Sequence, residues 1–159
     1  MRLWEMCLIA LVFFFSLNLA PMMFESFTSD RTWASNPPDS FHMFLGRYGQ
    51  KTANYWRVVS PLALLAFVIS LVVGWQAPDA RVWMSVAFGL YLAVQLSTMI
   101  YFVPEQEGLI SSAAALSRDV LRSRADRWIF LNYFRNAAGV LAYVALMLAV
   151  LAPRVPVLK

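Results

Sequence analysis

The sequence predicts an all-α protein, a four-transmembrane-helix up-down bundle built as one integral membrane domain over residues 1–159. Hydrophobic residues make up 60% of the chain and charged residues only 14%, against about 25% charged residues in a soluble domain. Four apolar runs are each long enough to cross a hydrocarbon layer of about 30 Å. Tryptophan or tyrosine borders most of these runs, which is typical of segments that end at a membrane interface.

The four predicted spans cover residues 5–24, 57–77, 82–103 and 128–152. We interpret the first as a retained span rather than a signal peptide, because only Arg2 precedes it, its apolar run is too long, and no A-x-A cleavage site follows. The short connection Pro78–Arg81 predicts a tight turn between the second and third spans, which makes those two helices antiparallel neighbours.

Two longer polar segments connect the remaining spans. In the first, Glu25 to Tyr55, the turn at Asn36–Asp39 predicts a short helix that begins near Ser40. The second, Gly108 to Arg127, is amphipathic, and we expect it to lie on the lipid headgroups or to extend the fourth span as a long helix. One predicted apolar stripe on it consists of Leu109, Ala113, Leu116 and Val120.

The distribution of basic residues predicts the orientation. Of the 13 Lys and Arg residues, nine lie in or beside the two long connections: Arg31, Arg47, Lys51, Arg57, Arg118, Arg122, Arg124, Arg127 and Arg135. Because positively charged loops stay in the cytoplasm, we expect both long loops to be cytoplasmic and both termini to lie outside. The same residues do not indicate a nucleic-acid partner, because they flank apolar spans; the expected partners are the lipid bilayer and other membrane subunits or a second copy of the chain.

Polar and aromatic residues gather at the span ends that this topology places beside the long loops. On a helix, Trp128, Asn132, Arg135 and Asn136 share one face, and a polar stripe inside a membrane span needs partners or a wet cavity. We therefore predict a cytoplasm-facing cavity at this end. Its candidate ligand-binding residues are Trp56, Arg57, Tyr101, Glu105, Trp128, Asn132, Arg135 and Asn136.

Arg135 is the most informative of these candidates. It lies about 10 Å deeper than Trp128 on a continuous helix, so its guanidinium requires a carboxylate, carbonyl groups or water. The partners expected from the topology are Glu105, Glu107 and Glu25. The alternative is that Arg135 extends to lipid phosphates, and the tryptophans have a similar alternative role as interface residues.

The sequence does not contain the usual signatures of a metal or cofactor site. Cys7 is the one cysteine and His42 the one histidine, so a metal site built from several His or Cys ligands is excluded. No cofactor is predicted, and ligation of a haem by His42 alone stays open. Glu105 and Glu107 point apart on a helix, so we expect one to pair with an arginine and the other to be solvated.

Four short motifs carry a resemblance to a known family. They are Asn18-Leu-Ala-Pro21, Trp56-Arg57 followed by Ser60-Pro61, Tyr101-Phe-Val-Pro104, and Trp128-x3-Asn132-x2-Arg135. In these motifs the chain resembles the small four-helix integral membrane proteins of bacteria, mostly uncharacterised, that are grouped with the anthrone oxygenases. The resemblance implies the fold and a place in the bacterial inner (plasma) membrane. An asparagine often follows the third-span proline in that family, and Glu105 stands there instead, which weakens any transfer of activity.

Two functional hypotheses follow. In the first, the protein is not an enzyme but an accessory subunit, or it binds a lipid or aromatic small molecule in the cytoplasm-facing cavity. In the second, it is an oxygenase-like enzyme that acts without a cofactor on an activated aromatic substrate, with Glu105, His42 or Tyr101 handling protons. The first is favoured because the sequence shows no nucleophile, metal set or cofactor motif.

Overall fold

The computed structural model describes residues 2–152, and every regular element in that range is helical. The helices are α1 (Leu3–Phe27), α2 (Ser29–Ala34), the 3-10 helix η1 (Asp39–Phe44), α3 (Ala53–Val73), α4 (Pro78–Ser97), the π-helix η2 (Thr98–Phe102), α5 (Val103–Ser111) and α6 (Arg118–Leu151). Four helical stretches are long and apolar enough to cross a membrane: Leu3–Ala34, Ala53–Val73, Pro78–Ser111 and Arg118–Leu151. The predicted all-α bundle is confirmed, and its composition fits a multi-pass membrane protein.

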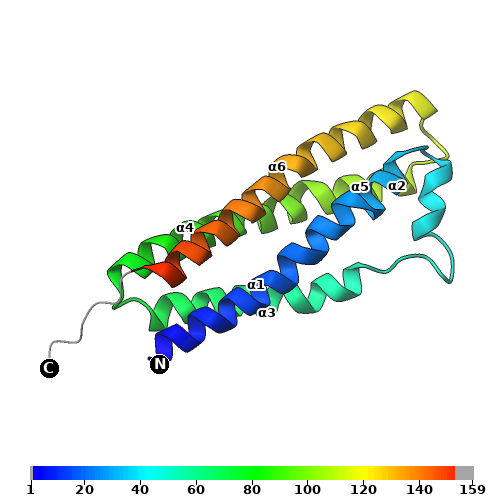
Figure 1. The fold of residues 1–159 in the computed structure, drawn as a ribbon. Helices are drawn as coiled ribbons and strands as arrows, with labels where there is room; N and C mark the ends of the chain where they lie inside the picture. The colour runs from blue at the N-terminus through cyan, green and yellow to red at the C-terminus, as the bar shows by residue number, and fades with distance from the viewer. Residues whose placement is uncertain (1, 153–159) are drawn as a thin grey trace, which may run out of the picture.

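The four stretches run up and down the bundle (Figure 1). α1 packs against both α3 and α6, and α4 packs along α6, while α3 contacts α4 much less. We call the end with the α3–α4 connection the turn end and the opposite end the loop end. The predicted tight turn exists, but it covers residues 74–77 rather than Pro78–Arg81. Pro78 instead occupies the first turn of α4, a position that proline favours because no intrahelical N–H partner is needed there.

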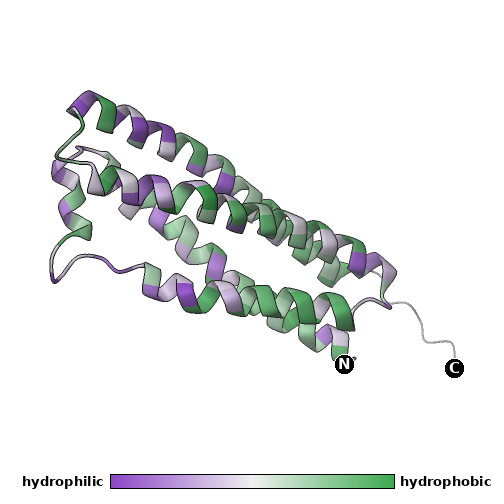
Figure 2. Ribbon diagram, turned by 180° about the vertical axis from the view of Figure 1, so that it is seen from behind, coloured by the Kyte–Doolittle hydropathy of each residue, from purple (hydrophilic) through white to green (hydrophobic). Residues whose placement is uncertain are grey.

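The stretches differ in length, and this difference shapes the loop end. α6 has 34 residues and the continuous α4–η2–α5 stretch also has 34, which at 1.5 Å per residue gives roughly 51 Å each. α3 has only 21 residues, or roughly 31 Å. The other three stretches therefore extend farther toward the loop end than Ala53, the first residue of α3. Figure 2 shows hydrophilic residues becoming more frequent on them toward that end.

Two separate apolar cores hold the helices together. The turn-end core consists of Leu8, Leu11, Phe15, Ala63, Phe67, Ala80, Met84, Ala87, Tyr91, Ala142, Ala145, Leu146 and Ala149. The loop-end core consists of Trp33, Ala34, Phe41, Phe102, Leu109, Leu121, Ala125 and Trp128. No residue of α3 belongs to the loop-end core, although α3 contributes Ala63 and Phe67 to the turn-end core.

The two long connections are more helical than the sequence suggested. The expected short helix near Ser40 is confirmed as η1, whereas α2 was not foreseen. The fourth span is indeed extended upstream, since α6 begins at Arg118, where the Ser117 side chain accepts a hydrogen bond from the backbone N–H of Val120 at 3.4 Å. The single apolar stripe predicted over Gly108–Arg127 is wrong. The chain turns between Ser111 and Arg118, so Leu121 rather than Val120 faces the core.

Candidate functional site

A cavity of about 610 Å³ lies between the two cores. Phe15 and Tyr91 of the turn-end core line its inner part, and Phe102 and Trp128 of the loop-end core line the opposite side. Its volume is within the range of roughly 300–1,000 Å³ that is usual for small-molecule sites. From its inner part the cavity extends toward the loop end of the bundle, the end at which the sequence analysis expected a site.

Arg135 enters this cavity from α6. Its guanidinium carbon lies 4.4 Å from the centre of the Phe102 ring and 5.6 Å from that of Trp128, so two aromatic faces support it. Its Nη1 donates a hydrogen bond to Thr98 Oγ1 at 3.4 Å, and its buried Nε has no hydrogen-bond partner in the part of the chain that the structure describes. A guanidinium has five N–H donors, so most of them are available to another group.

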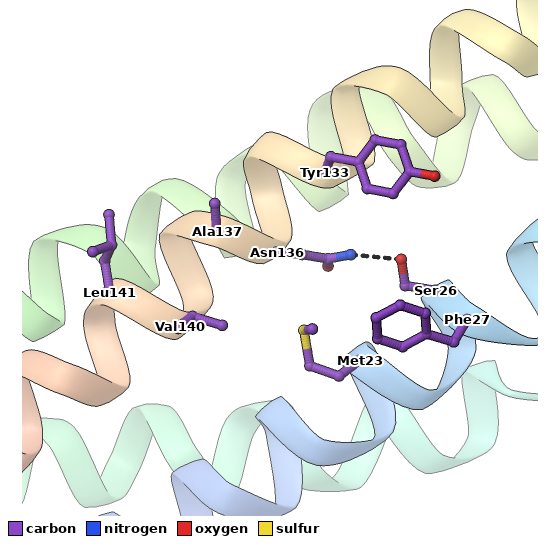
Figure 3. Close-up of a pocket in the computed structure, with 8 residues that line it drawn as sticks. All are labelled: Met23, Ser26, Phe27, Tyr133, Asn136, Ala137, Val140 and Leu141. Carbon is purple, nitrogen blue, oxygen red and sulfur yellow. Dashed lines mark hydrogen bonds between the residues drawn. The ribbon is translucent and has the colours of Figure 1, made fainter.

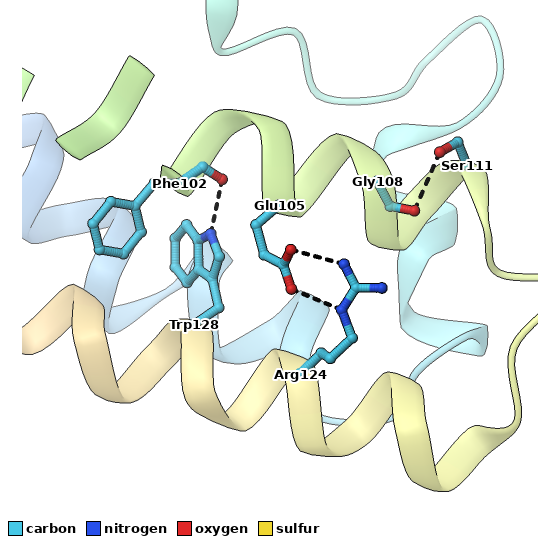
Figure 4. Close-up of polar contacts among 6 residues, drawn as sticks. All are labelled: Phe102, Glu105, Gly108, Ser111, Arg124 and Trp128. Atoms are coloured by element: carbon cyan, nitrogen blue, oxygen red, sulfur yellow. Dashed lines mark hydrogen bonds and ion pairs between the residues drawn. The ribbon is translucent and has the colours of Figure 1, made fainter. Parts of the chain in front are cut away.

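The π-helix η2 supplies two of the residues that hold Arg135. Thr98 and Phe102 are its first and last residues, and both line the cavity. The Trp128 indole donates a hydrogen bond to the Phe102 backbone carbonyl at 2.9 Å, which fixes the second ring beside the guanidinium (Figure 4). A single π-helical turn inside a longer helix is frequent at functional sites.

Two carboxylates face the same cavity. Glu25 accepts a hydrogen bond from the Trp56 indole at 3.2 Å, and the buried Asp30 accepts one from the Asn132 amide at 2.8 Å. Both carboxylates lie within electrostatic range of Arg135, and of each other. Across residues 2–152, however, no carboxylate oxygen lies within 4.0 Å of the Arg135 guanidinium, so the three charges form a loose cluster rather than a closed ion pair.

Neutral polar groups form the innermost part of the cavity. The Asn18 amide donates to the Val59 carbonyl at 3.2 Å and accepts from the Ser60 hydroxyl at 3.3 Å, while the Tyr91 hydroxyl donates to the Ser60 carbonyl at 2.8 Å. These bonds connect α1, α3 and α4 at one level. They satisfy each group with another part of the protein, which is the usual role of such residues inside a membrane bundle.

Proline chemistry explains one further connection between α1 and α3. Pro21 lies inside α1 and has no N–H, so it cannot donate to the Leu17 carbonyl four residues earlier. That carbonyl instead accepts a hydrogen bond from the Tyr55 hydroxyl at 2.6 Å. The first turn of α3 is thereby fixed to α1.

The eight predicted site residues fall into three groups. Four line the cavity: Trp56, Arg57, Trp128 and Arg135. Asn132 and Asn136 are buried beside it on the same face of α6. Asn136 donates a hydrogen bond to the Ser26 hydroxyl at 2.8 Å, next to a shallow apolar groove on the outer side of α1 and α6 (Figure 3). Neither Tyr101 nor Glu105 is among the residues that line the cavity.

Glu105 is not the partner of Arg135. It forms a two-point ion pair with Arg124, at 2.7 Å and 2.8 Å (Figure 4). Arg124 lies eleven residues before Arg135 on α6 and therefore meets α5 nearer the loop end. The expectation that one carboxylate of the Glu105–Glu107 pair binds an arginine is confirmed, and Glu107 is exposed at the rim of the cavity. Of the three partners expected for Arg135, Glu25 alone lies within electrostatic range.

Asp30 is the charged cavity residue that the sequence analysis missed. It was assigned to a polar loop, whereas α2 continues almost directly from α1 with a break at Thr28. The buried residues Asn18, Met22, Ser26 and Asp30 recur every four positions, so the helical periodicity of the first span continues past its apolar end. That periodicity was the available signal.

His42 lies in η1 with an exposed side chain and is not among the residues that line the cavity. In the described range no group of three or more His, Cys, Asp or Glu side chains is arranged to hold a metal ion. Comparisons of this chain with protein-family models, with curated proteins and with solved structures found no match. The resemblance to the four-helix bacterial family therefore stays a prediction.

Proposed function

We propose that this protein binds a neutral amphipathic small molecule in the cavity between its two cores. Arg135 supports this proposal most directly, because its guanidinium is held on the Phe102 ring with one hydrogen bond, to Thr98. Fixing a charged side chain in a largely apolar site with most of its donors unused is costly unless an acceptor from outside the chain, such as a ligand or water, completes it.

The charges of the cavity define the head group of the ligand. Five charged residues line the cavity: Glu25, Asp30, Glu107, Arg57 and Arg135. The exposed Arg57 and Glu107 offset each other, and Glu25 with Asp30 outweighs Arg135 by one negative charge when all are ionised, so an anionic head group is repelled. A neutral head that has a carbonyl oxygen for Arg135 and a hydroxyl for a carboxylate matches all three groups. The rings of Trp56, Trp128 and Phe102 surround the same place and suit a flat or aromatic head.

The membrane and the orientation belong to the same proposal. The excess of basic residues at the loop end supports a cytoplasmic cavity mouth, and the resemblance to the four-helix bacterial family supports an inner membrane location. In this proposal the protein binds its ligand on the cytoplasmic side of the bilayer, as an accessory protein that presents or stores the ligand.

Native mass spectrometry of the purified protein tests the proposal. The unaltered chain should retain a small molecule at one-to-one stoichiometry, and Arg135→Leu should lose it. Arg127→Leu is the matched control, because Arg127 is an exposed arginine on the same helix and does not line the cavity. A ligand that is absent from the unaltered protein, or equally retained by both variants, would contradict the proposal.

A second candidate function, a cofactor-independent oxygenase-like enzyme, has support from one observation. Glu25 and Asp30 place carboxylates within electrostatic range of a guanidinium, and such a base beside a cation can take a proton from an acidic aromatic and stabilise the resulting oxyanion. Oxygen uptake with a hydroxylated aromatic ketone distinguishes the two functions. An enzyme consumes oxygen and slows strongly in Asp30→Asn, whereas a binding protein consumes none.

A further inference from the structure

The cavity reaches the surface along the seam between α3 and the α4–η2–α5 stretch. Several residues that line the cavity are also exposed, and they belong to the two stretches that border this seam. Pro61 and Arg57 lie on the α3 side, while Met99, 71% exposed, and Val103, 44% exposed, lie on the other. The cavity therefore has a side opening between two membrane-spanning stretches, as well as a mouth at the loop end.

The seam is open because the first half of α3 is fastened to α1. Tyr55 and Trp56 both donate hydrogen bonds to α1, to the Leu17 carbonyl and to Glu25. Within the described residues, the bond from Tyr91 to the Ser60 carbonyl is the side-chain hydrogen bond between α3 and α4 that lies nearest the loop end. Beyond it the two helices separate (Figures 1 and 2).

The depth of the seam places its inner part among the acyl chains of a bilayer. Pro61 is twelve residues from Val73, the last residue of α3, and thus roughly 18 Å from the turn end. Met99 is twenty-one residues from Pro78, or roughly 32 Å from that end. A hydrocarbon layer of about 30 Å that begins at the turn end reaches past Pro61 nearly to Met99.

The residues along the opening change from apolar to polar in the same direction. Pro61 and Val94 line the deeper part, Arg57 and Met99 lie nearer the loop end, and Gln50, Gln106 and Glu107 line the part at the loop end itself. A molecule that lies in this opening meets acyl-chain chemistry at one end and headgroup chemistry at the other.

We propose that the ligand is a membrane-dissolved amphiphile with a single apolar chain, and that it enters sideways from the bilayer. Its polar head lies at Arg135, and its chain leaves through the seam between Pro61 and Met99. This inference rests on the proposed binding function and adds the class of ligand and its route. A compact water-soluble ligand that enters through the loop-end mouth is the alternative outcome.

Tryptophan quenching by a brominated single-chain amphiphile tests the route. Trp128 is only 3% exposed but lines the cavity, so an amphiphile contacts it only by entering. The test uses a variant whose other five tryptophans are phenylalanine; the bond from Tyr55 to the Leu17 carbonyl still holds α3 to α1 in it. The variant is reconstituted in phosphatidylcholine vesicles that contain a monoacylglycerol with bromine on the chain carbons nearest its head group. We expect Trp128 to lose most of its emission relative to vesicles with the same amphiphile without bromine. Acrylamide, a water-soluble quencher, should have little effect.

Two further variants locate the opening. Val94→Phe enlarges a buried side chain of α4 that lines the inner part of the opening and should restore most of the Trp128 emission, whereas Leu96→Phe, an exposed site on α4 that does not line the cavity, should leave the quenching unchanged. A variant with Trp33 as its sole tryptophan is the reference, because Trp33 is fully buried in the loop-end core and lines no part of the cavity. It should not be quenched by bromine.

The outcomes separate the route from the binding function. Quenching of Trp128 by acrylamide but not by bromine overturns lateral entry in favour of entry from water, and the absence of both overturns it in favour of a closed cavity. Quenching by bromine that Val94→Phe does not change overturns the assigned seam. None of these results bears on whether Arg135→Leu loses a bound molecule, which tests the proposed function by itself.

Discussion

The turn-end core and the loop-end core hold the bundle together by different means. In the turn-end core, small residues alternate with aromatic ones, and six alanines allow helices to approach closely around Phe15, Phe67 and Tyr91. Between membrane spans, lipid supplies no hydrophobic drive, so such close packing is the main source of cohesion. In the loop-end core, four large aromatic side chains fill the space between short segments, and the ion pair of Arg124 with Glu105 lies at its edge.

The difference explains where the cavity lies. All four stretches meet in the turn-end core, but α3 is shorter and contributes nothing to the loop-end core. Where α3 is no longer present, four packed stretches give way to three, and one side of the bundle is left unfilled. The polar groups that would be costly between packed spans, Arg135 with Glu25 and Asp30, are located at that point.

The largest expected effect concerns the side of the membrane on which each end of the bundle lies. In a background without Cys7, a cysteine introduced at Ser123 on the loop-end side and one at Gln76 in the turn should react oppositely with a thiol reagent that cannot cross membranes. Both sites are exposed. Because most basic residues lie at the loop end, intact cells should label Gln76→Cys only. Labelling of Ser123→Cys alone would reverse the orientation of the cavity.

A second test compares one aromatic residue from each core. Trp33→Ala should lower the free energy of unfolding by about 3–5 kcal/mol, because Trp33 is fully buried among aromatic rings outside the apolar part of the bundle. Phe67→Ala, equally buried in the turn-end core, should cost less, because surrounding lipid supplies no transfer term. Detergent unfolding followed by tryptophan fluorescence measures both. Equal losses would mean that the two cores share one environment.

The third test concerns the charged cluster between the cores. Arg135→Leu should lower the free energy of unfolding by about 2–3 kcal/mol, less than the roughly 3–5 kcal/mol of a closed buried ion pair, because its carboxylate partners lie farther away. Adding Asp30→Asn should recover part of that loss, whereas adding Glu105→Gln should not. Thermal melting in detergent measures the series. A neutral Arg135→Leu would indicate that the arginine only extends to lipid phosphates.

The smallest expected effect is at the edge of the loop-end core. Glu105→Gln removes an ion pair whose two side chains are 21% and 37% exposed, so its cost should be about 1 kcal/mol or less. High salt should reduce the difference from the unaltered protein further. The same melting measurement applies. A loss as large as that of Arg135→Leu would mean that the α5–α6 pair determines the stability of the whole bundle.

The sequence by itself determined the elements that depend on local pattern. Apolar length and composition placed the four spans, the Asn36–Asp39 turn placed η1, and the spacing of Trp128, Asn132, Arg135 and Asn136 predicted a polar face on α6, three of whose members are buried. These features follow from helical periodicity and from the cost of polar groups in lipid, which act over a few turns of one helix.

The tertiary structure decided the partners and the cavity. Glu105 forms an ion pair with Arg124 instead of Arg135, and Asp30 lies within electrostatic range of Arg135. Both outcomes depend on the rotation of each helix about its axis, which is set by packing against neighbours distant in sequence. The cavity likewise depends on α3 being tied to α1 by Tyr55 and Trp56 while three longer stretches continue past it. No single stretch of sequence carries that information, because the empty side exists only when all four helices are placed together.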